Sequence, residues 1–552
     1  DYIKRADVKV LYKYRITDVQ LANGYIKNIT LESSDGTKLG KSIAAKVFID
    51  CTYEGDLMAK AGVSYIIGRE DNKQYGETYN GVQLMKGHQF PDGVDPYKIK
   101  GDSTSGLLWG ISPAALSSDG TGDKLVQAYN YRICLTDNPA NKIEITRPEN
   151  YDSTKYELLL RLFDAQPNKR KLNHYFIWSR MPNNKTDINN RGGFSTDMIG
   201  MNHNYPEASY EERAEIIKAH KDYTQGLLYF YKTDPRVPQE LRDEIQAWGY
   251  PKDEYTEDNH WSPQLYIRES RRMTGDYVMT QAHCEGRETV TDGIGMAAYT
   301  MDSHNCQRLL VKKDGKYIVK NEGNVEIGGG LPYPISYRSI IPKEEECKNL
   351  LVPVCLSASH IAYGSIRMEP VFMVLAQSAA IAAAEAINTG SVQTVDIKKV
   401  QALLHENPLL DDSFSEILID DSELDLSINN DWEVIKKQGG YGPTFLKSKV
   451  RNGSPVRFSP HMEHEGKYKV YTYYHMRKDI SPAITYSISN GIDSWTRVIH
   501  KDSVRIEGQT TGEWIELGTY NFQKSSMPYI EISTGDTSGA VIADAVLFIP
   551  VK

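Results

Sequence analysis

The sequence lacks a basic excess and an uninterrupted apolar run of membrane length. Its 552 residues include 64 Lys and Arg against 73 Asp and Glu, which gives a net charge of −9. A nucleic-acid-binding surface needs a basic excess, so we expect no nucleic-acid partner. A membrane helix needs about 18 apolar residues in succession, and the longest apolar stretch, residues 371–387, is broken by polar and charged residues. We therefore predict no membrane span and interpret this stretch as a buried helix.

Cysteine is sparse, and its spacing points to no metal. The six cysteines at positions 51, 134, 284, 306, 347 and 355 form no CxxC pair. We therefore predict buried free thiols and neither a zinc site nor a dithiol redox motif. The histidines His461, His464 and His475 also show no ligand spacing, so we predict no metal site, although Ca²⁺ bound by loop carboxylates in this region stays open. Phenylalanine is scarce too, with 12 residues against 36 tyrosines, a surplus that suits polar ligands such as sugars.

The first 70 residues predict strands followed by a helix. Residues 8–12, Tyr14–Leu21 and Tyr25–Glu32 have strand patterns, and Asn23-Gly24 is a strong hairpin signal. Ala45–Asp50 is an apolar strand of the kind that parallel sheets bury on both faces. A helix from Asp56 to Ala61 should follow directly.

Helical patterns dominate from residue 70 to 290 and return near residue 370. Residues 207–231 predict a helix with Ser209 near its N-cap and Glu212 three residues on, and residues 239–248 predict another. A helix within 262–280 would place Arg268 and Arg272 on one face. Strands are expected between 317 and 340 and at 350–355, and helices at 370–387 and 397–406. Residues 411–430 are acidic and polar and predict a linker.

Three segments carry a resemblance to a known family. They are Phe48–Leu57, Tyr299–Asn305, and the long segment that begins at Tyr337–Pro342 and continues through Asn349 to Arg367. Together they resemble FAD-dependent oxidoreductases that are often found in polysaccharide-handling bacteria and often labelled xanthan lyases. The resemblance covers roughly residues 1–400. It implies bound FAD and hydride transfer between flavin and a small substrate, with sugar derivatives as candidates.

The long third segment also makes physical sense beside a flavin. A strand should lead to a turn at Gly364, where backbone can approach a flat ligand closely. The helix that opens at Glu369-Pro370 presents amide groups with partial positive charge. Such an end stabilises the negative charge of a reduced flavin at its pyrimidine edge. An ordinary strand, turn and buried helix would show the same pattern, so that alternative stays open.

The resemblance implies a set of site residues. His360, in the expected turn, is the first candidate for substrate contact or acid–base work, followed by His304 and by Arg272. Arg268 and Arg271 are candidates for clamping a substrate carboxylate, although Arg271 would also suit a simple carboxylate pair. For both histidines a structural, hydrogen-bonded role is the alternative. The implied cofactor-binding residues are Thr52, Gly55, Asp56, Arg338, Ser359, Gly364, Ser365 and Arg367. At one point the sequence departs from the family, because Tyr53 stands where the family's turn has glycine.

One element of such flavoproteins is missing from the sequence. They bind the FAD pyrophosphate with a Gly-x-Gly-x-x-Gly turn in the first strand–helix unit. Gly293–Ala298 matches GxGxxA, but no parallel strand precedes it, so we interpret the match as coincidence. The strand ending at Asp50 also needs parallel neighbours that the sequence does not evidently supply. Because the first residue is Asp1, we expect the pyrophosphate-binding segment upstream of it, which leaves FAD binding by this chain alone open.

Beyond the expected linker, helix signals end. Short alternating strands separated by Gly, Pro, Asn and Asp predict an antiparallel sandwich. Residues 431–432, 439–442, 466–471, 512–518 and 543–546 resemble the carbohydrate-binding-like domain of golvesin-type proteins and some xanthan lyases. The resemblance implies carbohydrate as a candidate partner and a periplasmic or extracellular location. Trp514 and Tyr468 would either stack on sugars or belong to the core.

We therefore predict an α/β fold, an incomplete flavoprotein dinucleotide-binding fold with a largely helical inserted domain, plus a C-terminal all-β sandwich. Residues 1–70 and 291–395 would form the FAD-binding domain, 71–290 the substrate or cap domain, 396–430 a helix and linker, and 431–552 the sandwich. The predicted function is an FAD-dependent oxidoreductase. The alternatives are a non-catalytic carbohydrate-binding protein on a degenerate flavoprotein scaffold, or a protein associated with polysaccharide (xanthan) lyases. The chain has no room for a lyase's helical toroid.

Overall fold

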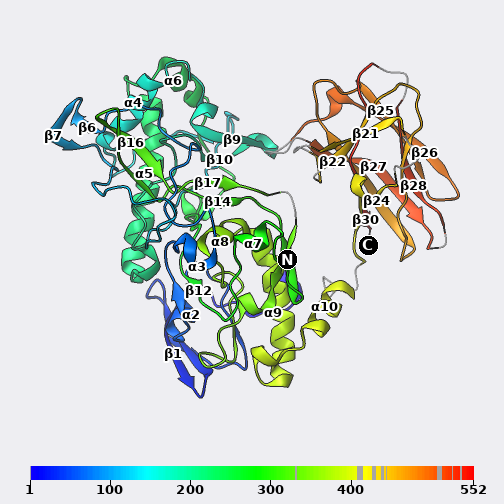
Figure 1. Cartoon of the computed structure of the whole chain (residues 1–552), viewed down its shortest axis with the longest axis horizontal. Coiled ribbons are helices and arrows are strands. Elements are labelled where there is room, and N and C mark those ends of the chain that lie inside the picture. Colours follow the sequence, from blue (N-terminus) through cyan, green and yellow to red (C-terminus); the bar gives the residue numbers. More distant parts are fainter. Residues whose placement is uncertain are drawn as a thin grey trace. The chain divides into compact units, whose positions relative to one another are not determined.

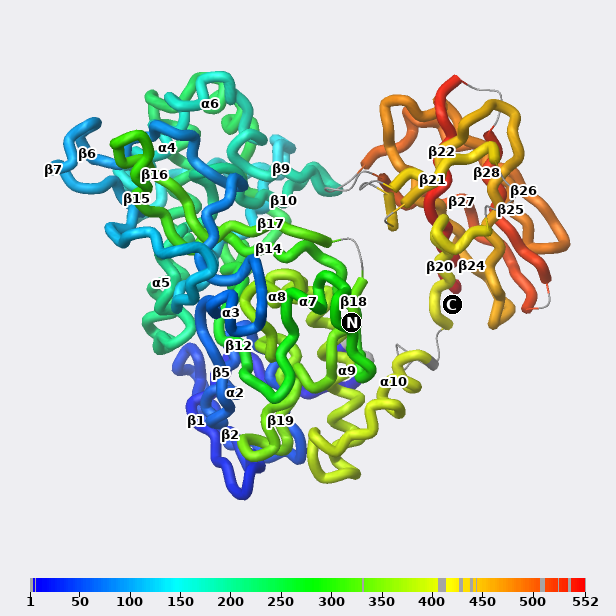
Figure 2. The backbone as a smooth tube through the Cα atoms, viewed as in Figure 1, coloured from blue at the N-terminus to red at the C-terminus, as the bar shows by residue number. Residues whose placement is uncertain are grey.

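The computed structural model describes residues 2–329, 332–406, 414–425, 430–436, 440–442, 444–506, 512–524, 526–534 and 538–551. The chain divides into two compact units. The first comprises residues 1–178 and 184–401, and the second comprises residues 179–183 and 402–552. Helices and short strands make up the first unit, whereas the second consists largely of strands (Figures 1 and 2).

The chain begins with the short helix α1 (Tyr2–Arg5) and a three-stranded meander, β1 (Tyr14–Ala22), β2 (Tyr25–Ser33) and β3 (Lys41–Ile43). Asn23 and Gly24 have φ of 55° and 78°, the left-handed pair that a tight hairpin turn requires, so the predicted hairpin is confirmed. The strand predicted at residues 8–12 is wrong. The Val8 amide instead donates to the Ile3 carbonyl at 3.1 Å, and the side chains of this segment are mostly exposed.

The first unit contains a parallel strand pair. β4 (Phe48–Ile49) pairs in parallel with β19 (Leu350–Leu351), so the chain itself supplies the neighbour that the sequence did not reveal. The predicted helix follows as α2 (Asp56–Lys60). Met58 and Leu350 are fully buried in the core beneath these elements.

The central region combines helices with many short strands, so the prediction of a largely helical insertion is only partly met. α5 (Tyr210–Thr233) has the predicted capping box between Ser209 and Glu212, and α6 (Gln239–Gln246) follows. These helices pack around a core of buried aromatic rings. The remaining elements are β5 (Tyr65–Ile66), α3 (Asn72–Tyr75), β6 (Tyr97–Ile99), β7 (Asp102–Leu107), β8 (Lys142–Ile143), α4 (Glu157–Ala165), β9 (Phe176–Met181), β10 (Lys185–Asn190), β11 (Tyr250–Pro251), β12 (Arg272–Met273) and α7 (Gln281–Cys284).

Residues 262–280 do not form the helix on which Arg268 and Arg272 would share a face. The segment around β12 is extended, and every residue from Ile267 to Met273 is buried. An amphipathic helix would expose one face of this run. The extended chain instead turns successive arginines toward different carboxylates, and those carboxylates come from other parts of the unit.

Six more strands and two helices complete this unit. The strands are β13 (Gly293–Ala297), β14 (Met301–Ser303), β15 (Gln307–Lys313), β16 (Lys316–Glu322), β17 (Val325–Ile327) and β18 (Tyr333–Ser336), and the helices are α8 (His360–Ile366) and α9 (Glu369–Thr389). The Gly293–Ala298 match lies in β13, which pairs with β18, so it forms no phosphate-binding turn. Gly364 lies inside α8 and not in a turn, which corrects the prediction. A Cβ there would sit 2.6 Å from the Asp302 carbonyl oxygen, so this glycine lets α8 approach β14.

Gly364→Ala tests this close approach. Alanine would stabilise a helix by about 1 kcal/mol, but overlap with strand backbone costs about 1–3 kcal/mol. We expect a net loss of about 1–2 kcal/mol in thermal unfolding, with Asp302 displaced. Gly62→Ala is the control, because its φ is 74° but a Cβ there meets nothing within 4 Å. Gly62→Ala should lower the stability only through the strain of a non-glycine residue at positive φ, and it should leave β14 in place. A Gly364→Ala protein as stable as wild type would contradict the close approach.

Among the described residues α9 alone is long and apolar enough to cross a membrane, with 39% of its most apolar window buried. It packs against β13 and β4, as a core helix does. Its predicted start near Pro370 is confirmed, as is the following helix, α10 (Ile397–Glu406).

The second unit is a set of antiparallel sheets, as predicted. One sheet has the order β20-β30-β24-β27, another β23-β28-β25-β26 and a third β21-β22-β29. The strands are β20 (Ile417–Asp420), β21 (Trp432–Lys436), β22 (Thr444–Ser448), β23 (Val456–Phe458), β24 (Gly466–His475), β25 (Ala483–Ser489), β26 (Ser494–His500), β27 (Gly512–Phe522), β28 (Tyr529–Ser533), β29 (Ile542–Ala543) and β30 (Ala545–Pro550).

The predicted linker at 411–430 is wrong in part. β20 pairs with β30 and so belongs to the sandwich, whereas residues 411–413 and 426–429 lie outside the described residues. Tyr468 is 1% exposed and is a core residue.

Candidate functional site

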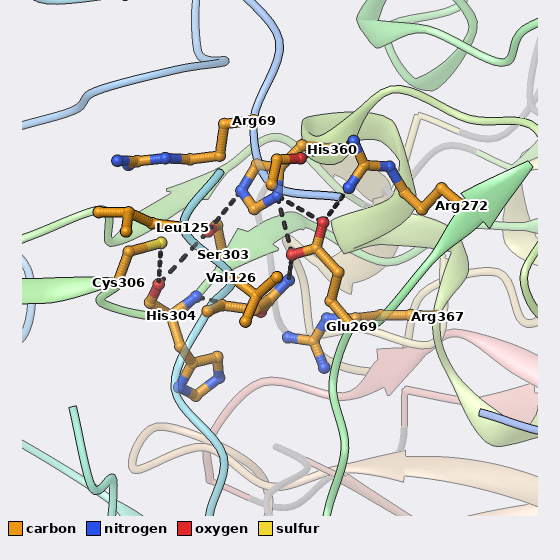
Figure 3. A network of polar contacts seen from close by, with 12 residues as sticks. Arg69, Leu125, Val126, Glu269, Arg272, Ser303, His304, Cys306, His360 and Arg367 are labelled. Carbon is orange, nitrogen blue, oxygen red and sulfur yellow. Dashed lines mark hydrogen bonds and ion pairs between the residues drawn. The ribbon is translucent and has the colours of Figure 1, made fainter. Parts of the chain in front are cut away.

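A buried chain of hydrogen bonds links three elements of the first unit. The Ser303 hydroxyl lies 2.9 Å from His360 Nε2, and His360 Nδ1 lies 2.9 Å from a Glu269 carboxylate oxygen. Ser303 ends β14, His360 begins α8, and Glu269 lies in the extended segment before β12. All three side chains are buried, and Figure 3 shows them converging. The arrangement fixes the imidazole ring between a hydroxyl and a carboxylate.

The start of α8 is held by two further carboxylates. The Ser359 hydroxyl caps the helix by accepting from the Ala362 amide at 3.3 Å and donates to Glu77 at 2.6 Å. The His360 amide donates to Glu70 at 2.9 Å. Because a helix N-terminus carries partial positive charge, these anions stabilise it and fix the position of His360.

Arg272 joins the two carboxylates beside His360. Its guanidinium donates to Glu269 and, at 2.7 Å, to Glu70, and its Nε donates to the Ala358 carbonyl at 3.0 Å. Burial opposes ionisation of Glu269, but the charges of His360 and Arg272 outweigh it and lower the pKa of Glu269 to about 2. Since protein groups engage each nitrogen of Arg272 and the side chain is fully buried, the geometry favours a holding role over the predicted catalytic one.

His304 belongs to a second buried group. Its Nδ1 lies 2.8 Å from Asp197, which also pairs with Arg268 at 2.9 Å. Burial works against ionisation of Asp197, yet the charges of Arg268 and His304 keep its pKa below the usual range. His304 Nε2 lies 3.7 Å from Asp302, and the His304 side chain is 10% exposed. With Nδ1 donating to Asp197, Nε2 is the nitrogen available for proton transfer.

Arg367, at the end of α8, lies beside the same buried group as His304 and Arg268. It donates to the Tyr266 hydroxyl at 3.1 Å and pairs with Asp302 at 3.3 Å. The guanidinium carbons of Arg268 and Arg367 lie 5.3 and 5.9 Å from the centre of the Tyr266 ring. The Nε atoms of both arginines are buried and have no partner within the described chain. Buried donors of this kind favour a ligand that accepts hydrogen bonds.

The turn after β4 forms a separate cluster. Gly55 has φ of 66°, which favours glycine, and its amide donates to the Thr52 hydroxyl at 3.0 Å. Asp56 pairs with Arg213 at 2.6 Å and with Arg271 at 2.8 Å, so Arg271 has a carboxylate partner within the protein. A cavity of ≈ 520 Å³ lies beside this turn. The turn therefore lies next to open space at the carboxyl end of a parallel strand.

The structure groups most of the predicted residues but not all. His360, Arg272 and Ser359 share one cluster, and His304, Arg268 and Arg367 share the neighbouring one. Arg338 lies apart, pairing with Asp292 and stacking on Tyr277 at 3.9 Å with its side chain 50% exposed. Ser365 donates to the Tyr299 carbonyl and accepts from Tyr333.

Sequence reasoning missed Glu269, Asp197 and Glu70. Glu269 could have been found, because a lone acid among Arg268, Arg271 and Arg272 suggests internal charge pairing. Asp197 and Glu70 have no such local signal.

The residues present fit the flavin end of an FAD molecule. The exposed start of α9 at Glu369 and Pro370 follows Arg367 directly, and the buried Nε of Arg367 lacks a partner. The pyrophosphate end is different, because the sequence has no Gly-x-Gly-x-x-Gly turn. Thr52, Gly55 and Asp56 offer instead a turn beside a cavity at a strand end, where nucleotides bind in open α/β sheets.

The first unit thus combines a parallel strand pair, a long Ala-rich helix and a buried His–Asp pair. The model of the FAD dependent oxidoreductase family matches residues 1–404, and the chain belongs to this family. The model of the Golvesin C-terminal domain matches residues 417–550. No curated protein matches the chain.

Solved structures resemble only part of the chain. A Paenibacillus xanthan lyase is 22% identical over 25% of this chain and 13% of its own, with a TM-score of 0.22. A Podospora anserina GH26-CBM35 β-(1,4)-mannanase is 11% identical over 25% of this chain and 28% of its own, with a TM-score of 0.20. An exo-β-1,3-galactanase from Phanerochaete chrysosporium is 14% identical over 24% of this chain and 29% of its own, with a TM-score of 0.19. At such TM-scores these likenesses support no conclusion about the whole chain.

Proposed function

We propose that the chain is an FAD-dependent oxidoreductase that transfers a hydride between flavin and a small substrate, with sugar derivatives as candidates. The observation that carries the proposal is the position of Asp302. Its carboxylate lies 3.7 Å from His304 Nε2 and 3.3 Å from Arg367, which stands two residues before the first residue of α9 in the sequence. A candidate acid–base group and a cation thus lie beside residues for which the family resemblance implies flavin binding, which supports the proposal.

Each residue has a role in this proposal. His304, oriented by Asp197, is the general acid or base, and Arg268 and Arg367 bind an anionic or carbonyl group. His360, with Glu269 and Ser303, holds β14 and α8 together as a positioning residue. When bound, FAD supplies the two-electron acceptor.

The remaining predicted cofactor residues are supporting contacts in this proposal. Thr52, Gly55 and Asp56 form the turn toward the nucleotide end, and Ser359, Gly364 and Ser365 fix α8. Arg338 is exposed and pairs with Asp292, so it has no role at the cofactor in this proposal.

The pyrophosphate needs a further element in this proposal. The exposed face of α9 is apolar, with Met373 72% and Ile387 46% exposed. β4 and β19 form only a two-stranded parallel pair, whereas parallel sheets are covered on both faces. We infer that this apolar face and the open strand pair are the place at which a Gly-rich strand–turn–helix unit would pack to hold the pyrophosphate.

Flavin binding tests the proposal directly. The chain, alone and together with any further residues that its gene encodes, is titrated with FAD while flavin fluorescence and visible absorption are followed. We expect saturable binding that Arg367→Met weakens and Arg338→Met does not. Absence of binding by the complete natural protein would reject the proposal and favour a carbohydrate-binding protein on a degenerate scaffold. Release of unsaturated, ultraviolet-absorbing product from xanthan would favour the lyase-associated alternative.

We further propose that the second unit binds carbohydrate, on the strength of three clustered aromatic rings. The Tyr441 ring centre lies 5.2 Å from that of Trp514 and 5.9 Å from that of Tyr473, and Tyr441 is 45% exposed. Rings of this kind offer apolar faces with polar edges to a sugar. The proposal includes a periplasmic or extracellular location.

Trp514→Ala should weaken polysaccharide binding by about tenfold, the equivalent of about 1.4 kcal/mol. Affinity electrophoresis in gels containing xanthan or mannan measures the effect. Tyr529→Ala is the control, because this ring lies on β28 in another sheet, over Arg457 at 4.0 Å. Equal losses in both variants, or no retardation of wild type on any glycan, would contradict this surface.

A further inference from the structure

Three carboxylates meet at one end of the sandwich in the second unit. Asp420 ends β20, Asp421 follows it, and Asp544 separates β29 from β30. Antiparallel pairing places Asp420 opposite Ala545, beside Asp544. One oxygen from each carboxylate lies within 4.8 Å of the others. The strand register therefore brings three negative charges to one point.

Burial makes this cluster costly without a cation. Asp421 is 2% exposed and Asp544 is 0% exposed, and no ion pair in the described part of the chain reaches any of the three. A buried carboxylate normally has a cationic partner, because burying an unpaired charge is strongly unfavourable.

An unpartnered atom inside the cluster points to a ligand. Asp420 Oδ1 is buried and accepts no hydrogen bond, whereas its Oδ2 accepts from the amide and hydroxyl of Ser422. Buried oxygens without a donor are rare, and an ion or ordered water is the usual explanation. An oxygen that faces other carboxylates and lacks a donor suits a cation.

The backbone of residues 440–442 lies directly against the cluster. The Tyr441 amide donates to Asp544 at 3.1 Å. A Cβ on Gly440 would lie 2.8 Å from Asp544 Oδ2, and one on Gly442 would lie 2.9 Å from Asp420 Oδ1. The backbone that carries the Tyr441 ring therefore lies against these carboxylates.

We propose that Asp420, Asp421 and Asp544 bind a calcium ion that fixes residues 440–442 and thereby the Tyr441 ring. Calcium is a hard cation that takes oxygen ligands in flexible geometry, and the described cluster offers carboxylate oxygens without His or Cys. Metal binding is measured without flavin or glycan, so a failure of this proposal is distinguishable from a failure of the proposed function.

Terbium luminescence tests the site in the full chain after chelator treatment. Tyr441 and Trp514 lie close enough to sensitise a bound Tb³⁺ ion under ultraviolet excitation. We expect Tb³⁺ luminescence that saturates and that decreases when Ca²⁺ displaces the bound Tb³⁺. Asp544→Asn should abolish this luminescence. Asp502→Asn, which alters an exposed acid of the same unit, should bind as wild type does. Wild-type protein without saturable, Ca²⁺-displaceable luminescence would overturn the proposal, and so would equal losses in both variants.

Thermal unfolding separates metal binding from misfolding. Excess Ca²⁺ should raise the melting temperature of the wild-type second unit by about 5 °C and leave that of Asp544→Asn unchanged. Without metal, Asp544→Asn should be at least as stable as wild type, because an amide removes a buried charge. If Asp544→Asn does not fold, Asp420→Asn takes its place, since Asp420 is partly exposed. A wild-type melting temperature that does not respond to Ca²⁺ would refute the site.

Discussion

Glu269→Gln is expected to lower the free energy of unfolding of the first unit by about 3–5 kcal/mol. The substitution keeps the shape of the side chain but removes the charge that faces both Arg272 and His360. Since Arg272 is fully buried, the loss leaves it with Glu70 as its only carboxylate partner. Urea denaturation followed by far-ultraviolet circular dichroism measures the difference from wild type.

The control for this prediction is Glu157→Gln. Glu157 pairs with Arg236 at 2.6 Å, but their side chains are 33% and 48% exposed. Removing an exposed pair of this kind costs about 1 kcal/mol or less. Similar losses in the two variants would show that the buried cluster is not a stabilising centre.

The effect of Glu269 should also depend on pH. Its pKa is lowered in the folded protein, from 4.5 to about 2. The stabilisation from its ionised form is therefore complete above pH 4.5 and is lost as the pH falls toward 2. The stability difference between wild type and Glu269→Gln should narrow over this window.

His304→Gln is expected to reduce turnover by about 10²–10⁴-fold once a substrate that reduces the flavin is known. Glutamine cannot exchange a proton, so the pH dependence of kcat should flatten while KM and FAD content change little. Anaerobic flavin reduction measures the step directly. Asp197→Asn should shift the pH profile, because Asp197 fixes the ring through Nδ1.

His500→Gln is the control for this substitution, because His500 is exposed on β26 of the second unit and should not affect turnover. If His304→Gln turns over as fast as wild type, His304 is not the general acid or base. An equal loss in Asp197→Asn without a change in the pH profile would reduce the pair to a structural role.

The sequence predicted the elements that local chemistry defines. Asn23-Gly24 specified its hairpin, Ser209 and Glu212 specified the start of α5, and alternating strands specified the sandwich. These features depend on neighbours within a few residues, so a single sequence contains their full signal.

The misses depend on contacts between distant residues. The Arg268–Met273 segment has a helical pattern of arginines, but its partners Asp197, Glu70 and Asp56 come from elsewhere and keep the chain extended. Gly364 suggested a turn, yet it serves close packing between α8 and β14. β4 gave no sign of its partner, because β19 lies far along the chain.

The pairing of β4 with β19 also has a consequence for biosynthesis. The neighbouring contact from the Ile26 amide to Asn349 spans 323 residues, so the amino-terminal meander cannot complete its contacts until that much chain has been made. At about 5–20 residues per second, a ribosome needs roughly 15–65 s to supply it. During that interval the apolar strands of the meander are exposed to aggregation and to proteases. The first unit therefore completes its folding late, whereas the sandwich strands β20 to β30 lie within residues 417–550 and need less chain.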